Sequence, residues 1–462
     1  MKLTQVEIEN FRCFEHLRVS LEDDVTAVIG VNGAGKTALL DAIALSSLPL
    51  FQDIARRQPN AATLDFPTFY RHFTGTAIMP ADIRLNAPGR ADRDGEQVLT
   101  LSTEARYQQG SAEPPLVLKW QQEAGVIRSL NASRFSQRWV APEGLDVANQ
   151  GLYCPGVSAS DTRHIATPAL AYYRDTRDAQ ILKSSGEVNG RSSDPDSARH
   201  MALDAAASFS EAQRWFYVRE NKELRDPKRS DDFSWQDPVL RAVRDAVGKM
   251  LGGIERVYAD DDPPRMKAVQ KDANGLSMVL DFSQLSAGQR NLMALTIDFA
   301  RRLALTYSGW DNPLEAPGIL LIDEIELNMH PRWQQTVIPH LRKVFPDTQI
   351  VVATHSPLVL STLHARQIRI LRGQQIFVPS VETYGTASDR VQRQVMDTDT
   401  TPPENAFAQD VAQLYAQIDG DDLGAAEVLL ARLEDERGTA EPTLIRARML
   451  VANRRWEGEL GL

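Results

Sequence analysis

The stretch "VIGVNGAGKTALLDAI", residues 28–43, decides the fold of this chain. A compact apolar run ends just before its glycines and predicts a buried strand. The residues after them predict a helix over 37–55, interrupted at Pro49. A glycine-rich turn between a strand and a helix directs successive backbone N–H groups inward, where they bind phosphate oxygens. The stretch therefore indicates a nucleotide-phosphate site at the end of a strand.

The turn contains the complete Walker A pattern GxxxxGK[ST], in the strand and helix context that the pattern requires. Lys36 is expected to bridge the β- and γ-phosphate oxygens of ATP, and the Thr37 hydroxyl is expected to hold Mg²⁺. A chance glycine turn is the alternative, and the flanking elements argue against it. The residues expected to contact the nucleotide here are Gly30, Asn32, Gly33, Ala34, Gly35, Lys36, Thr37 and Ala38.

A second motif, "GILLIDEIE", begins with apolar residues that predict a buried parallel strand and ends with acidic ones. The strand carries Asp323 and Glu324 to the edge of the sheet. Asp323 is expected to orient the magnesium ion, and Glu324 to polarise the attacking water as general base. A solvated acidic turn is the alternative interpretation, and the Walker A loop favours the catalytic one.

Two further patterns complete the expected site. His355 follows the predicted strand "QIVVA", at the strand end where ligands of open α/β sheets gather, so a γ-phosphate contact is favoured over a structural histidine. In "QLSAGQRNLMAL", Ser286, Gly288 and Gln289 open a helix, which is another anion-binding start. One γ-phosphate does not need two such helix starts. The second is therefore expected to bind the nucleotide held by another copy.

The bulk composition describes a globular protein of 462 residues with 42% hydrophobic content. The 62 acidic residues exceed the 51 basic ones, which argues against a surface that coats nucleic acid throughout, although a local basic groove stays open. The two cysteines, Cys13 and Cys154, exclude a disulfide framework and a multi-cysteine metal site. With no apolar run long enough to span a membrane, the chain is expected to be soluble and cytoplasmic, without membrane partners.

The pattern along the chain predicts an α/β protein with three regions. Residues 1–378 are expected to form the nucleotide-binding head, which includes a mixed inserted lobe at about 56–275. Antiparallel strands are predicted around "VLTLSTEARYQQ" and "PLVLKWQQ", and two helices are predicted before Gly252 and Gly253. Residues 379–462 are expected to be a small helical tail for partner docking.

The order of these motifs resembles the ABC-type ATPase head shared by SMC, RecF and OLD-like proteins. The resemblance implies a P-loop NTPase fold of the ABC type. It also implies two ATP molecules between the heads of a head-to-tail homodimer or higher homo-oligomer. Glu324 would then be the general base, and His355 would contact the γ-phosphate. "ENFRCF" resembles the first strand of these proteins, whose arginine approaches nucleotide, and Arg12 is the matching residue.

Three other segments resemble the standalone PtuA-type ATPases of Septu and retron anti-phage systems, which act with an HNH nuclease partner. They are "ALAYYRDTRDA" (169–179), "IELNMHPRWQQ" (325–335) and "VETYGTASDRVQRQVMDTDTTPP" (381–403). The middle of the chain departs from the family pattern. No Q-loop glutamine is found in 60–110, where Asp82 is a candidate instead, and Asn328 replaces a histidine that relatives often carry.

Two functions from different classes remain. The first is a Mg²⁺-dependent, slow or partner-regulated ATPase that scaffolds or restrains a separate nuclease, since this chain has no HNH or TOPRIM cluster of its own. The second is a RecF- or SMC-like DNA clamp in repair, in which Arg163, Arg174 and Arg177 could contact phosphates, although a solvated charged face is favoured. Phage DNA or retron RNA/DNA is left open as a partner. The long stretch between Walker A and Ser286 disfavours a transporter subunit.

Overall fold

The computed structural model describes most of the chain, and its contacts divide it into two compact units, Met1–Val391 and Gln392–Leu462. The predicted boundary after residue 378 and the inserted lobe at 56–275 stay predictions. The helix expected over 37–55 is observed from Lys36 to Ser46. The residues described are 1–47, 97–107, 116–129, 132–140, 168–174, 198, 202–203, 205–226, 234–261, 264–271, 274–398 and 404–460.

A six-stranded sheet forms the centre of the first unit, in the order β14-β13-β3-β12-β11-β7. All neighbours pair in parallel except β13 and β14. Four of its strands, β3, β12, β11 and β7, are buried along their whole length, which explains why their sequences are unbroken apolar runs. The strands are β3 (Val25–Ile29), β7 (Ala169–Tyr173), β11 (Gly318–Ile322), β12 (Thr348–Ala353), β13 (Ile368–Arg372) and β14 (Gln375–Phe377).

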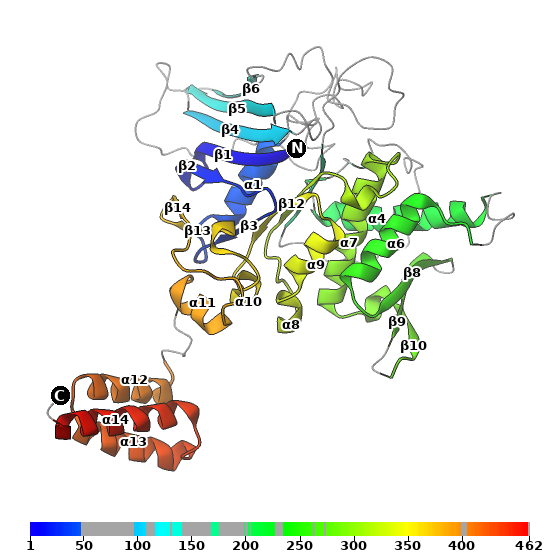
Figure 1. Ribbon diagram of the computed structural model, residues 1–462. Coiled ribbons are helices and arrows are strands. Elements are labelled where there is room, and N and C mark those ends of the chain that lie inside the picture. Colours follow the sequence, from blue (N-terminus) through cyan, green and yellow to red (C-terminus); the bar gives the residue numbers. More distant parts are fainter. Residues whose placement is uncertain are drawn as a thin grey trace. The chain divides into compact units, whose positions relative to one another are not determined.

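A second, antiparallel sheet packs over helix α1 (Lys36–Ser46), which lies between the two sheets in Figure 1. Val6 and Ile8 alternate with polar neighbours in its strand β1 and are fully buried, as expected for a strand with one face on the core. The predicted antiparallel pair in the middle of the chain is also confirmed, as β4 and β5. The strands, in sheet order, are β2 (Phe14–Ser20), β1 (Lys2–Phe11), β4 (Gln97–Tyr107), β5 (Leu116–Ser129) and β6 (Ala132–Val140).

The remaining elements of this unit include a three-stranded antiparallel sheet that was not predicted, in the order β10-β9-β8. It consists of β8 (Ile254–Asp261), β9 (Pro264–Lys271) and β10 (Ser277–Asp281). Helix α7 packs against α4, α6 and β7, so it joins this region to the edge of the central sheet. The helices are α4 (Ala205–Leu224), α6 (Pro238–Met250), α7 (Ala287–Thr306), α8 (Pro331–Gln334), α9 (Val337–Val344), α10 (Pro357–Leu360) and α11 (Ser388–Gln394), with short 3₁₀ turns at Phe282–Gln284, Pro313–Glu315 and Ala365–Gln367.

The second unit consists of three helices with an apolar core of their own. Leu414, Ile418, Leu433 and Leu444 are almost completely buried in it. The Asn405 and Asp422 side chains cap the first two helices by accepting backbone N–H groups. The helices are α12 (Ala406–Asp419), α13 (Leu423–Arg437) and α14 (Pro442–Leu460). Among the residues that the structure describes, no helix is long and apolar enough to cross a membrane.

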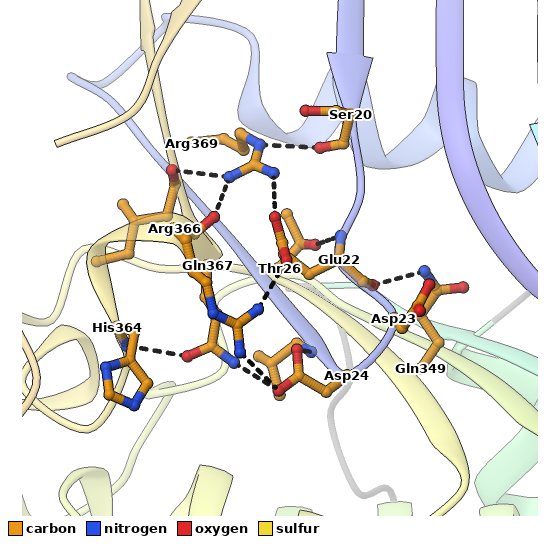
Figure 2. Close-up of polar contacts among 12 residues, drawn as sticks. Ser20, Glu22, Asp23, Asp24, Thr26, Gln349, His364, Arg366, Gln367 and Arg369 are labelled. Carbon is orange, nitrogen blue, oxygen red and sulfur yellow. Dashed lines mark hydrogen bonds and ion pairs between the residues drawn. The ribbon is translucent and has the colours of Figure 1, made fainter.

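A polar network ties the loop between β2 and β3 to strand β13 (Figure 2). Arg369 is buried and donates to Ser20 O at 2.8 Å and to the Glu22 carboxylate at 2.9 Å. The side-chain amide of Gln349 on β12 donates to Glu22 O at 2.8 Å and to Leu3 O of β1 at 2.7 Å, and it accepts the Leu3 N–H at 2.7 Å. The network therefore joins the antiparallel sheet to the parallel one.

Asp24 completes this network at the start of β3. Burial of its carboxyl acts to raise the pKa of Asp24, but hydrogen bonds from Val25 N and Gln367 and the charges of Arg342 and Arg366 outweigh it. The pKa of Asp24 is therefore lowered. A lowered folded-state pKa means that the charged form stabilises the protein above the unfolded-state pKa. This contribution is lost as the pH falls through the folded-state pKa.

Asp24→Asn is accordingly expected to lower the free energy of unfolding by about 1.5 kcal/mol at pH 7, the lower end of the range for hydrogen bonds to charged groups. The loss should be constant down to a pH of about 5 and shrink below a pH of about 4. Urea unfolding followed by circular dichroism over this pH range measures it. Asp23→Asn is the matched control, because this exposed neighbour pairs with the exposed Arg106. Equal losses at all pH values would contradict the assignment.

Candidate nucleotide site

The Walker A loop connects the end of β3 to the start of α1. Gly33 and Gly35 have φ values of 77° and 103°, which lie in the left-handed region that favours glycine. A Cβ atom on Gly35 would lie 2.7 Å from Cys13 Sγ and 2.8 Å from the Phe14 ring. The loop therefore packs directly on the turn between β1 and β2, and only glycine fits this close approach.

The tip of the loop, formed by Val31, Asn32 and Gly33, is exposed, so its backbone is accessible to a ligand. Ala34 N donates to Val31 O at 3.1 Å and closes the turn. Ala38 packs against the core below the loop. The expected phosphate-binding residues thus form one continuous cradle at the start of α1.

Lys36 is almost completely buried beneath this loop. Its ammonium group donates to Gly30 O at 3.0 Å and to Val31 O at 3.2 Å. Burial lowers the pKa of Lys36, and the negative charges of three carboxylates, those of Asp323, Glu324 and Glu326, offset this only in part. The lysine therefore lies between the Walker A cradle and a group of acidic side chains.

Walker A and the acidic segment "GILLIDEIE", which is the Walker B motif, are joined by one hydrogen bond. The Thr37 hydroxyl donates to Asp323 Oδ2 at 2.7 Å, although these residues are 286 positions apart. Asp323 is 1% exposed, and its backbone N–H donates to Tyr173 O at 2.8 Å. A hydroxyl and a carboxylate oxygen are the hard ligands that Mg²⁺ prefers, and nucleotide sites hold this ion with few protein ligands. The paired Thr37 and Asp323 oxygens therefore fit a magnesium site.

Glu324 begins a tight turn after β11 with a φ of 46°, an uncommon value for a residue other than glycine. The turn is held by bonds on both sides, from Ile325 N to Ala353 O at 3.2 Å and from Leu327 N to Glu324 O at 2.9 Å. Strained backbone of this kind is kept where the surroundings hold it, often at functional sites. The half-buried Glu324 is thereby fixed at the same sheet edge as Asp323.

Glu326, for which the sequence predicted no role, ties the loop of His355, the switch histidine, to the turn after Walker B. Glu326 accepts the Thr354 hydroxyl at 2.7 Å and the His355 backbone N–H at 2.5 Å. Thr354 N also donates to Val28 O at 3.1 Å, which holds the loop against β3. The only sequence signal for Glu326 was a third carboxylate within "DEIE". Its two contacts make it the physical link between Walker B and His355.

Helix α7 begins at Ala287, within the segment "QLSAGQRNLMAL", which is called the signature from here on. Ser286 caps the helix, and its backbone and hydroxyl exchange hydrogen bonds with Gln289. A Cβ atom on Gly288 would lie 2.5 Å from Asn328 O, so a larger residue would collide with backbone. Asn328 itself has a φ of 61°, which asparagine tolerates better than most residues. The exposed Ser286 thus sits on a helix start that packs against the turn after Walker B.

Arg12 lies in the turn between β1 and β2 with a φ of 48°. Its guanidinium pairs with Asp41, a buried carboxylate on α1, and lies 5.0 Å from the centroid of the Phe11 ring. The structure therefore places Arg12 beside the Walker A helix, while its contact with nucleotide stays a prediction. Asp82, Arg163 and Arg177 lie outside the described residues.

Two family models match the chain. The AAA ATPase domain matches residues 1–52, and the AAA domain described as "putative AbiEii toxin, Type IV TA system" matches residues 172–361. These two segments contain Walker A, Walker B and the switch histidine. The signature at Ser286 also lies within the second match.

Two similar proteins align with most of this chain, and a third aligns with a shorter part of it. "Retron Ec83 probable ATPase" of Escherichia coli is 26% identical over 99% of this chain and 88% of its own length. "Retron Vc95 probable ATPase" of Vibrio cholerae is 23% identical over 87% of this chain and 80% of its own length. "Septu protein PtuA" of Bacillus mycoides is 35% identical over 28% of this chain and 17% of its own length. A solved SMC head domain from Thermotoga maritima aligns with 82% of this chain and 100% of its own length, at a TM-score of 0.40 and 13% identity.

The motifs, the matching family models and these relatives define an ATPase of the ABC type, of the SMC- and RecF-like kind. Within that class, the chain is similar to the ATPases of the retron and Septu anti-phage defence systems. The α/β fold, the ATPase activity and the superfamily expected from the sequence are confirmed.

Glu326→Ala removes both hydrogen bonds that hold the loop of His355. We expect the kcat for ATP hydrolysis to fall roughly tenfold or more with little change in KM, because misplaced groups affect mainly the transition state. Glu326→Gln keeps one acceptor and should lose less. Glu382→Ala is the matched control, because this exposed carboxylate also accepts backbone N–H groups, those of Ala365, Thr383 and Tyr384. A Glu326→Ala variant with the wild-type kcat would show that this link is dispensable.

Proposed function

We propose that the chain binds ATP with Mg²⁺ at the Walker A cradle and hydrolyses it there. The observation that carries this proposal is the 2.7 Å hydrogen bond between Thr37 and Asp323, which joins the two motifs at the carboxyl edge of the parallel sheet. The backbone of the loop from Gly30 to Ala38 binds the phosphate chain, and Lys36 neutralises its charge. Arg12 approaches the nucleotide from the neighbouring turn.

In this proposal, Glu324 orients and polarises the attacking water, and His355 contacts the γ-phosphate. The ion, when bound by Thr37 and Asp323, supplies electrostatic stabilisation of the phosphate oxygens. The positive φ of Glu324 and the two hydrogen bonds from Glu326 to the His355 loop support these roles. Positioning of this kind before the nucleotide arrives would stabilise the transition state without reorganisation of the site.

Two copies of the chain complete each site in the proposed assembly. Ser286, Gly288 and Gln289 contact the nucleotide held by the second copy. The exposure of Ser286 and the helix start that it caps support this role, because backbone N–H groups at such a start favour an anion. Because Gly288 packs on Asn328, the signature moves together with the turn after Walker B in the same copy.

We propose further that this dimer or higher homo-oligomer acts in the cytoplasm as the ATPase subunit of an anti-phage complex. It scaffolds or restrains a separate nuclease effector of the HNH or another type. Residues 379–462 supply the docking region, and nucleic acid, either phage DNA or retron RNA/DNA, is a further candidate component. The similarity to retron ATPases over almost the whole chain supports this reading over a free-standing repair clamp.

The ATP site is tested with two variants. Glu324→Gln should lower kcat roughly a hundredfold or more, since a general base contributes about 10²–10⁴-fold, and should trap ATP in a dimer. Lys36→Ala should lose nucleotide binding. Hydrolysis assays, nucleotide titration and light scattering measure these effects, with the exposed Glu315→Gln as control. If both variants hydrolyse ATP at the wild-type rate, the assigned site is wrong.

The partner is tested by affinity purification of the tagged chain expressed with its neighbouring genes, followed by mass spectrometry and nucleic-acid analysis. A stoichiometric nuclease is the expected result. A variant truncated after residue 391, at the observed boundary between the two units, should lose the nuclease and keep nucleotide binding. A chain that elutes alone and binds duplex DNA only with ATP would instead favour the clamp function, and its affinity should then fall steeply with salt.

A further inference from the structure

A buried carboxylate beside the Walker A loop is bound by two arginines. Asp41 is 2% exposed and lies on α1 four residues after Thr37, one helical turn or about 6 Å further along the axis. Arg174 Nη2 lies 2.8 Å from Asp41 Oδ1, and Arg12 Nη1 pairs with Oδ2. Since one guanidinium would neutralise the carboxylate, this group of three side chains retains a positive charge.

Both arginines are held in place, yet neither is buried. Their side chains keep 34% and 35% of their surface exposed, for Arg12 and Arg174 respectively. Arg174 lies 5.3 Å from the centroid of the Tyr172 ring, as Arg12 does near Phe11, and such contacts with ring faces fix a guanidinium plane. The arrangement orients two cationic groups toward solvent at a defined place.

Arg174 belongs to the same sheet edge as the Walker motifs. It is the first residue after β7, which pairs in parallel with β11, and the preceding Tyr173 O accepts the Asp323 N–H. Tyr172 reports how close the two groups lie. Burial raises the pKa of the Tyr172 hydroxyl, and the negative charges of Asp41 and Asp323 raise it further. The Tyr172 side chain therefore lies near both Asp41, which pairs with the two arginines, and Asp323 of Walker B.

The electrostatics of the nucleotide site call for more positive charge than Lys36 supplies. Three carboxylates, those of Asp323, Glu324 and Glu326, act on the single ammonium of Lys36. A magnesium-bound triphosphate still carries a net negative charge, and Glu324 and Glu326, which are not ligands of the ion in the proposed site, repel it. Cations at the flank of the loop offset that repulsion, and a planar guanidinium binds phosphate through two parallel hydrogen bonds.

We propose that Arg174 contacts the phosphate chain of the nucleotide at the Walker A loop, and that Asp41 is the positioning residue that holds its guanidinium there. The proposal deepens the ATPase site proposed above and rests on it. It also gives the end of β7 a role beside Walker B, where residues 60–110 of the sequence supplied no Q-loop glutamine.

The experiment is a titration of the full chain with the β,γ-imido analogue of ATP in the presence of Mg²⁺. We expect Arg174→Gln to raise Kd roughly tenfold, and Arg174→Lys roughly threefold, because lysine keeps the charge and loses the bidentate geometry. Arg219→Gln is the matched control, since Arg219 of α4 pairs with the carboxylate of Asp237, which caps α6, and, within the described part of the chain, is assigned no contact with the Walker motifs. Its Kd should equal that of the wild type.

Asp41→Asn tests the positioning role. It should also raise Kd, and the double variant with Arg174→Gln should bind more tightly than the product of the two single effects predicts, because both changes act on the Arg174 guanidinium. Any further loss beyond Arg174→Gln alone is expected from Arg12, which also pairs with Asp41. Effects that simply multiply would overturn the positioning role. Thermal melting of each variant identifies any change that acts through unfolding.

The outcomes separate this proposal from the ATPase site itself. If the wild type binds the analogue, Lys36→Ala does not, and folded Arg174→Gln binds like the wild type, the role of Arg174 is overturned while the site stands. If Arg174→Gln does not fold, a folded Arg174→Lys with wild-type Kd overturns the bidentate contact. If the wild type itself does not bind the analogue, the proposed ATP site fails.

Discussion

The parallel register of β3, β12, β11 and β7 is the constraint on which the rest of the site depends. It brings the carboxyl ends of four strands to one edge of the sheet, where each continues into a functional loop. The 2.7 Å hydrogen bond from Thr37 to Asp323 closes this edge between residues 286 positions apart. A slip of one residue in any of these pairs would turn the side chains of that strand to the opposite face and separate the motifs.

Three parts of the proposed ATP site meet at the turn after β11: Walker B, the loop of His355 and the signature. The first residue of this turn, Glu324, has a left-handed backbone conformation, and Glu326 accepts a hydrogen bond from the loop of His355. The carbonyl of Asn328 packs against Gly288 of the signature. In the proposed ATP site, a change in nucleotide state at Asp323 would therefore reach both His355 and the start of α7 through contacts within a few residues. Such a two-sided connection is what an ATPase needs if hydrolysis in one copy is to alter its contacts with another.

A buried charged cluster also connects α7 to β7, the outermost strand of the central sheet beside β11. Asp298 on α7 binds Arg301 and Arg302 at 2.8 Å each and accepts the Tyr173 hydroxyl at 2.7 Å. Burial acts to raise the pKa of Asp298, but the two arginines and the hydrogen bonds from Arg302 and Tyr173 outweigh it, so its pKa is lowered. Removing one charged partner would leave an uncompensated buried charge within α7, and the Tyr173 hydroxyl joins this cluster to β7.

The sequence by itself determined the phosphate cradle, the buried strands and the capped helices of the tail, because each depends on consecutive residues. Glycines permit the left-handed turn at Gly33 and Gly35, and an unbroken apolar run specifies a strand buried on both faces. Only the tertiary structure decided which side chains meet across the edge. Glu326 bonds to residues 28 and 29 positions away, and Asp41 on α1 pairs with Arg174, which follows β7, so neither contact leaves a periodic or local signal. The three-stranded sheet before α7 was missed for the same reason, since its pairing is a contact between strands and not a property of any one of them.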